Sequence, residues 1–163
     1  MIYNTNINLI IANLNLNMKV IILKLFIAAG LFLSTQNIVA QNPVNWTSKQ
    51  LIEPSNLATI LKTNKKLPLI FSVGPAATIP HSVEIGMVKD KANLDKFKKQ
   101  LNGIQKNKKI VVYCGCCPYE HCPNVRPAID VLKQMGFTNY FLLDLPQNIK
   151  KDWIDKGYPV VKM

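Results

Sequence analysis

Short apolar runs alternate with helix-type patterns along the chain after Gln41. Leu67–Val73 is typical of a buried strand, and Lys109–Cys114 is too apolar to lie half exposed, which favours a central strand of a parallel sheet. Asn93–Gly103 repeats apolar residues three and four positions apart, as an amphipathic helix does. This alternation of strand and helix predicts an α/β layer structure with a mostly parallel sheet.

The other elements are predicted by the same rules. We expect strands at 67–73, 82–88, 109–114 and 139–145, and helices at 55–63, 93–103, 124–135 and 146–157. Ser55 and Asn124 are the expected helix caps, because their short polar side chains can accept hydrogen bonds from the free N–H groups of a first turn. Pro127 fits the first turn of its helix, and Gly136 is expected to end it.

The first 40 residues resemble a leader rather than part of the domain. Residues 1–17 are rich in asparagine and carry no charge, whereas Met18 begins a signal-peptide pattern with two lysines, the apolar run Leu25–Leu33 and a cleavage point near Ala40. The apolar run is shorter than the roughly 20 residues that cross a bilayer. We expect translation to start at Met18, export to the periplasm or secretion, no stable membrane insertion after cleavage, and one domain at 41–163.

Positive charge is spread over that domain. The whole chain has a net charge of +11, and the two lysines of residues 1–40 account for all the charge removed with them, which leaves +9. Such a surplus attracts anions in general. The lysines are scattered and are not interleaved with aromatic residues, so we expect no binding to nucleic acid.

Every cysteine lies in one loop. Cys114, Cys116, Cys117 and Cys122 fall within nine residues, and Arg126 just beyond them is the only arginine of the chain. The loop connects the expected central strand to the next helix, and in parallel sheets ligands bind at the carboxyl ends of the strands. This loop is therefore the candidate site.

The surroundings of the loop favour a thiolate. The following helix directs its free N–H groups and the positive end of its dipole at the loop. Arg126 and His121 are further potential donors, and loop amides can curl into an anion nest. We expect this setting to lower the pKa of a cysteine from about 8.5 by one unit or more.

Several segments resemble the rhodanese (sulfurtransferase) family. The segment "IVVYC", the loop and helix after it, and the C-terminal "GFTNYFLLDLPQNIKKDWIDKGYPV" follow the family pattern, with Trp153 retained. "TIPHSVEIG" is similar to the family's His-Ile-Pro-Gly segment, with Ile79-Pro80 retained. The resemblance runs from about Trp46 to Val161 and implies a rhodanese-like three-layer fold, with helices on both faces of the sheet.

The resemblance implies a two-step sulfur transfer. Cys114 takes the place of the sulfur-carrying cysteine: it accepts sulfur from a small anionic donor such as thiosulfate, and the persulfide passes it to cyanide, a thiol or a partner protein. Arg126 would stabilise the anions, Cys117 and Cys122 are alternative or resolving thiols, and no cofactor is implied. The substrate-binding residues expected around the persulfide are Gly115, Cys116, Tyr119, His121 and Asn124.

The chain departs from the family pattern in three places. The usual Asp-Val-Arg reads Ser72-Val73-Gly74, so an ion pair is missing, and the His and Gly of the second motif read Thr78 and His81. Eleven residues separate Cys114 from Arg126, where the family has four or five. Related phosphatases and arsenate reductases need Cys, five residues and Arg, and no cysteine here has that spacing, which argues against phosphoryl transfer.

Other functions of the cluster stay open. One is dithiol–disulfide chemistry, or a persulfide resolved by a neighbouring thiol. Cys117 or Cys114 would then pair with Cys122, since adjacent cysteines fit disulfide geometry poorly. Another is a zinc or Cu(I) site made by the four cysteines and His121. The last is a disulfide that only pins the loop on an inactive scaffold.

Overall fold

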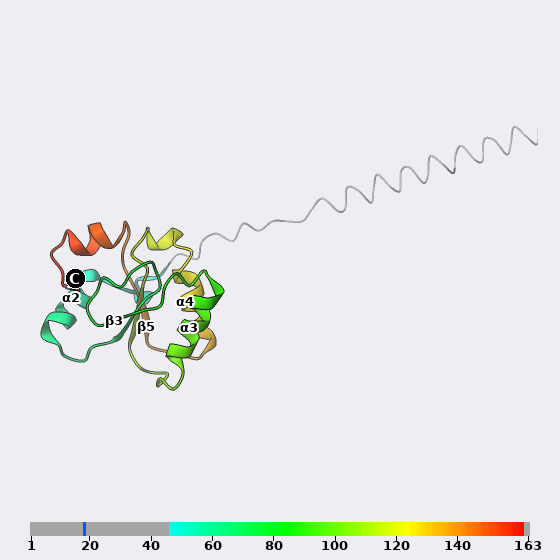
Figure 1. The fold of residues 1–163 in the computed structure, drawn as a ribbon, viewed down its shortest axis with the longest axis horizontal. Coiled ribbons are helices and arrows are strands. Elements are labelled where there is room, and N and C mark those ends of the chain that lie inside the picture. The colour runs from blue at the N-terminus through cyan, green and yellow to red at the C-terminus, as the bar shows by residue number, and fades with distance from the viewer. Residues whose placement is uncertain (1–17, 19–45, 162–163) are drawn as a thin grey trace, which may run out of the picture. The chain divides into compact units, whose positions relative to one another are not determined.

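The computed structural model describes Met18 and residues 46–161, and residues 46–161 build an α/β fold around a five-stranded sheet (Figure 1). The spatial order of the strands is β1-β5-β4-β2-β3, and all neighbouring strands are parallel. The predicted α/β class and parallel sheet are thereby confirmed, with β4 in the middle. The strands are β1 (Leu51–Ile52), β2 (Leu69–Ser72), β3 (Ser82–Glu84), β4 (Ile110–Tyr113) and β5 (Tyr140–Leu143).

Helices cover both faces of the sheet, as a three-layer fold requires (Figure 1). One face packs against α3 (Lys91–Leu101) and α4 (Val125–Gln134), and the other packs against α2 (Pro54–Thr63) and the short π-helix η3 (Lys150–Ile154). The 3-10 turns are η1 (Ser48–Gln50) and η2 (Tyr119–His121).

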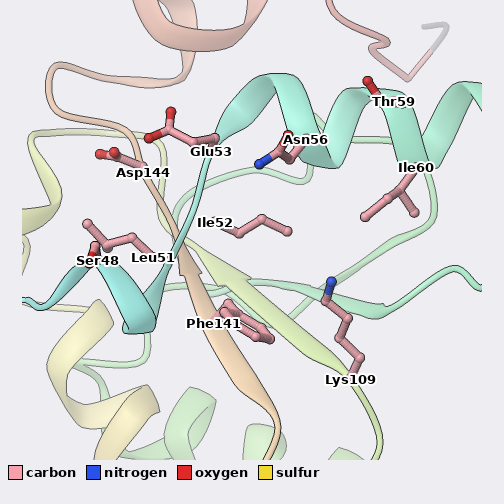
Figure 2. Close-up of a pocket in the computed structure, with 10 residues that line it drawn as sticks. All are labelled: Ser48, Leu51, Ile52, Glu53, Asn56, Thr59, Ile60, Lys109, Phe141 and Asp144. Atoms are coloured by element: carbon pink, nitrogen blue, oxygen red, sulfur yellow. The ribbon is translucent and has the colours of Figure 1, made fainter.

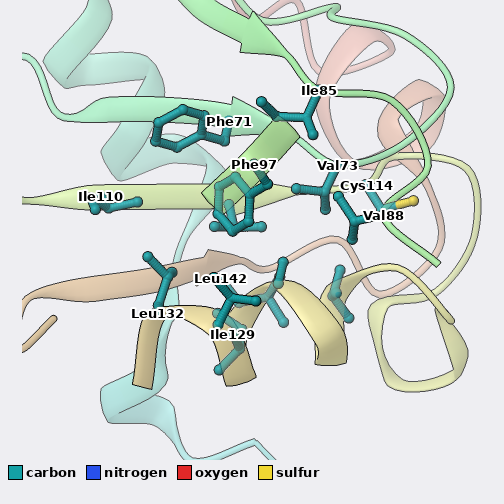
Figure 3. Packing of buried hydrophobic residues seen from close by; sticks show 14 of the residues in the cluster. Phe71, Val73, Ile85, Val88, Phe97, Ile110, Cys114, Ile129, Leu132 and Leu142 are labelled. Atoms are coloured by element: carbon teal, nitrogen blue, oxygen red, sulfur yellow. The ribbon is translucent and has the colours of Figure 1, made fainter. Parts of the chain in front are cut away.

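Strand β4 is apolar on both faces because it serves both hydrophobic cores. Ile110 and Val112 lie in the core with α3 and α4, whereas Val111 and Tyr113 lie in the core with α2 and Trp153. Side chains alternate between the two faces of a strand, so one buried strand contributes to both. Figure 3 shows the first core, where Phe71, Phe97, Ile110, Leu132 and Leu142 converge and the Cys114 sulfur lies at its edge.

Some element boundaries differ from the prediction. The edge strand β1 was not predicted, because two residues are too few to show an alternating pattern. Helix α2 begins at Pro54 with Glu53 as its cap rather than at Ser55, since proline suits a first turn whose N–H groups have no partner.

The last predicted helix is shorter than expected. Residues 146–157 contain only the π-helix η3 in place of a long α-helix. The Asp152 carboxylate accepts hydrogen bonds from the backbone N–H groups of Gln147 and Asn148, at 2.7 and 2.8 Å. These bonds hold the preceding turn in a non-helical form, so the helix starts later.

The N-terminal predictions fall almost wholly outside the described residues. Apart from Met18, the leader at 1–40 and its cleavage point are not described, so export and the domain boundary at 41 stay predictions. In the described part of the chain, no helix combines the length and the apolar character needed to cross a bilayer.

A buried tyrosine hydroxyl holds the Thr78–Ser82 segment against the sheet. The Tyr113 oxygen accepts hydrogen bonds from the backbone N–H groups of Thr78 and Ile79, at 2.9 and 3.2 Å, and lies 3.0 Å from the Ser82 hydroxyl. His81 in this segment has φ of +63°, a left-handed conformation that favours glycine. Tyr113 is thus the anchor of the Thr78–Ser82 segment.

We predict that Tyr113→Phe destabilises the protein. The change leaves the buried N–H group of Ile79 and that of Thr78 without their acceptor, which should cost about 2 kcal/mol in free energy of unfolding. Urea unfolding checks this value, with Tyr140→Phe on half-buried β5 as the control. Equal stabilities of the two variants would contradict the assigned role of the hydroxyl.

Candidate functional site

Cys114 follows the last residue of the central strand β4, at the carboxyl edge of the sheet. The N–H of Val73 donates to the carbonyl of Tyr113 at 2.9 Å, which continues the pairing of β2 with β4 by one residue. This pairing brings Gly74 against Cys114. A Cβ atom on Gly74 would lie 2.8 Å from the Cys114 sulfur and would collide with the Cys114 carbonyl oxygen.

Three cysteine sulfurs converge where β4 ends. The Sγ atoms of Cys114 and Cys116 are 3.1 Å apart, and those of Cys114, Cys116 and Cys122 all lie within 4.8 Å of one another. Cys117 is joined to this group through Cys116, at 3.2 Å between the sulfurs. All four cysteines are free thiols in the structure. Their close approach permits disulfide, persulfide or metal chemistry.

The sulfurs differ sharply in burial. Cys114 is 5% exposed and Cys122 is 1% exposed, and both belong to the core shared with α4. Cys116 is exposed, and Cys117 is half-buried. The cluster therefore runs from the apolar interior to the surface, with Cys116 on the solvent side.

Asn124 orients a hydrogen-bond donor at the Cys114 sulfur. Its side-chain oxygen accepts from the N–H of Lys89 at 3.1 Å, so its amide nitrogen faces Cys114 and donates to Sγ at 3.4 Å. Asn124 is 2% exposed and stands at the N-terminus of α4, where it was predicted. It makes no side-chain cap, however, because both ends of the amide are used in these two contacts.

The expectation of a lowered thiol pKa is wrong for this arrangement. The pKa of Cys114 is raised well above its usual range, because its thiol shares a hydrogen bond with Cys122 and because it is buried. Donation from the Cys116 backbone, the Cys116 thiol and Asn124 lowers this pKa, but by less. Burial and then the contact with Cys114 raise the pKa of Cys116. Burial followed by the Cys116 thiol raises the pKa of Cys117 to about 11.

Arg126 lies in the first turn of α4, as predicted. Its guanidinium donates to the Glu120 carbonyl at 3.3 Å and stacks over the Trp46 ring, 5.6 Å from the ring centre. Among the described residues, these two contacts hold the cysteine loop at Glu120, and neither of them involves a sulfur. Its predicted role towards anions stays a prediction.

The other predicted site residues take different places. Gly115 is buried, has φ of +81° and packs against Ile149, whose N–H donates to the Gly115 carbonyl at 2.9 Å. Tyr119 is half-buried in η2, and its N–H donates to the Leu145 carbonyl at 3.3 Å. His121 is exposed and is not part of the three-sulfur group. The structure thus joins Asn124 and the cysteines but leaves His121 outside.

Sequence reasoning missed two features of the site. The first is the Cys114–Cys116 contact, which the glycine between them permits through its left-handed φ. A glycine between two cysteines was thus the sequence signal that could have indicated their contact. The second is Gly74, whose lack of a side chain gives Cys114 its space. Gly74 lies forty positions away from Cys114 in the sequence, so no local pattern indicates their contact.

One hollow among the described residues lies away from the cysteines. It has a volume of about 810 Å³ and lies along α2 and the β1 edge of the sheet, where Glu53, Asn56, Lys109 and Asp144 line it (Figure 2). No thiol lines it. Because the chemistry of the chain is concentrated in the cysteine cluster, we place the candidate site at that cluster and not in the hollow.

No family model matches the chain, and no curated protein matches it. The functional argument therefore depends on the chemistry of the cluster itself.

We predict that Gly74→Ala is more damaging than a glycine substitution in open space. The added methyl group would meet the Cys114 carbonyl and sulfur, and overpacking of this kind should cost about 3 kcal/mol in stability. Gly103→Ala, with nothing within 4 Å but φ of +76°, should cost about 1 kcal/mol. Urea unfolding of both variants compares them, and similar costs would contradict the packing described here.

We predict that alkylation of Cys117 in reduced, chelator-treated protein accelerates with pH into the alkaline range. Because its pKa is about 11, the thiolate fraction should rise about tenfold for each pH unit below that value. Iodoacetamide labelling with peptide mapping measures the rate, and Cys117→Ser identifies the adduct. A plateau already at about pH 8.5, the ordinary pKa of cysteine, would show that its surroundings do not protonate it.

Proposed function

We propose that this protein is a rhodanese-like sulfurtransferase in which a pair of thiols, Cys114 and Cys116, handles a sulfane sulfur. The single observation that carries the proposal is the 3.1 Å contact between their sulfurs at the carboxyl end of the central strand. That edge is where parallel sheets bind their ligands. The resemblance of the flanking segments to the rhodanese family supports the same reaction class.

Cys114 is the proposed sulfur carrier. Its sulfur receives hydrogen bonds from the Asn124 amide and the Cys116 backbone, and these donors suit a sulfur that bears negative charge. Its own sulfur lies at the edge of the core, away from bulk water. The exposed Cys116 lies on the solvent side of the pair, where a donor arrives.

The first step transfers the outer sulfur of an anionic donor such as thiosulfate. The Cys114 thiol releases its proton to solvent, and its sulfur bonds to the outer sulfur of the donor. The S–S bond of thiosulfate breaks, and its electron pair leaves with sulfite. The product is a Cys114 persulfide, a covalent intermediate that divides one transfer into two easier steps. The net positive charge, +11 for the whole chain and +9 without the two lysines of residues 1–40, favours the approach of such anions.

The second step removes that sulfur by one of two routes. An external nucleophile such as cyanide or a thiol can take the outer sulfur and restore Cys114. Alternatively, the Cys116 thiol attacks the inner sulfur, hydrogen sulfide leaves with the thiol proton, and a Cys114–Cys116 disulfide remains. An external dithiol then reduces the disulfide. The second route needs the two sulfurs in contact, as they are here.

The same contact favours a second candidate function, which is dithiol–disulfide exchange without sulfane sulfur. Thiol–disulfide exchange requires only that one thiolate reach a disulfide sulfur, and Cys116 is both exposed and beside Cys114. The two candidate functions differ in whether the protein gains a sulfur atom during the reaction. The mass of the treated protein therefore distinguishes them.

We predict that thiosulfate loads one sulfur atom on Cys114. Intact-mass analysis of reduced wild-type protein treated with thiosulfate should show the adduct or the Cys114–Cys116 disulfide with released sulfide. Cys114→Ser should gain no sulfur and form thiocyanate from cyanide only at the uncatalysed rate, because the carrier is gone. Cys116→Ser should keep the persulfide but release less sulfide.

Cys117→Ser, a change at the neighbouring thiol of the same loop, is the matched control and should behave as wild type. Loading of Cys114→Ser would contradict the assignment of the carrier. If no variant gains sulfur and only a disulfide forms with an oxidised dithiol, the second candidate function replaces the first.

A further inference from the structure

Cys122 is a buried thiol that sulfur transfer leaves without a role. It is 1% exposed and belongs to the core shared with α4, yet its sulfur lies within 4.8 Å of those of Cys114 and Cys116. Packing in the core does not require the Cys122 sulfur to lie this close to the sulfurs of Cys114 and Cys116. The three sulfurs together form a convergent set of soft ligands.

The spacing of this set is close to that of a metal site. Sulfur atoms about 2.3 Å from a common ion in a planar arrangement lie about 4 Å from one another. All three distances here are at most 4.8 Å, and the Cys114 and Cys116 sulfurs are 3.1 Å apart. A small outward shift of the exposed Cys116 would open the group to this geometry. The other two sulfurs are held by the sheet and the core.

The surroundings also support ligand thiolates. The Asn124 amide donates to the Cys114 sulfur, and its own oxygen is fixed by the Lys89 N–H. Hydrogen bonds of this kind orient the ligands of metal sites and tune their charge. Cys114 and Cys122 are shielded from water, while Cys116 gives an ion access from solvent.

We propose that Cys114, Cys116 and Cys122 bind one thiophilic Cu(I) ion in three-coordinate geometry. Thiolate ligands select Cu(I) and zinc among the common metals. A structural zinc site takes four protein ligands in a tetrahedron, whereas the group found among the described residues offers three sulfurs and leaves out Cys117 and His121. The coordination number therefore favours Cu(I).

Binding involves no change of oxidation state. Each thiol that becomes a ligand releases its proton to the buffer, and its sulfur displaces one of the acetonitrile ligands with which the ion is supplied. The inference goes beyond sulfur transfer and does not rest on it. It does imply that one cluster cannot hold a copper ion and a persulfide on Cys114 at the same time.

The test uses the reduced full chain under anaerobic conditions, with Cu(I) supplied as its acetonitrile complex. Native mass spectrometry should find one ion per chain, and competition with a chromophoric Cu(I) chelator gives the affinity. Cys116→Ser, a change at an exposed position that leaves the core intact, should weaken binding at least about tenfold. Cys122→Ala should also weaken binding at least about tenfold, and circular dichroism verifies that this variant is folded.

Cys117→Ser is the matched control, because it removes a thiol of the same loop outside the three-sulfur group, and its affinity should match that of wild type. X-ray absorption of the loaded protein should show three sulfur neighbours. Failure to form a one-to-one complex, unchanged affinity in Cys116→Ser, or an equal loss in Cys117→Ser would overturn the site. Tighter binding of zinc with four ligands would overturn the choice of ion.

Discussion

The pairing of β2 with β4 at their carboxyl ends is the constraint on which the site depends. The hydrogen bond from Val73 to Tyr113 carries the ladder one residue past the strands and presses Gly74 against Cys114. Only a residue without a side chain fits there, so Cys114 is held against backbone on one side. The remaining space around its sulfur is then filled by Cys116, Cys122 and the Asn124 amide.

Opposing physical effects meet at this sulfur. The Cys122 thiol and burial favour the protonated form, while the Cys116 backbone and the Asn124 amide donate hydrogen bonds that favour an anion. The first pair of effects is larger, so the pKa of Cys114 is raised in the free-thiol state. Collecting cysteines near a helix N-terminus does not by itself create a reactive thiolate. Burial of the sulfur and the neighbouring thiols decide whether the thiol ionises.

Local patterns predicted the framework well where a segment was long and consistently apolar. The central strand at 109–114 was recognised because both of its faces are buried, and α4 because Ile129 and Leu132 repeat at helical spacing. The prediction failed where a few residues outweighed the pattern. β1 is only two residues long, and Asp152 holds the turn before η3 through its carboxylate.

The sequence by itself determined the α/β class, the alternation of helices and strands after β1, and the loop that holds every thiol, because these follow from periodicity and from positions along the chain. Tertiary structure decided which thiols meet, which way their pKa values move and what Arg126 contacts. Those properties depend on burial and on residues distant in the sequence, such as Gly74 beside Cys114 and Lys89 beside Asn124. Only the folded sheet sets these distances.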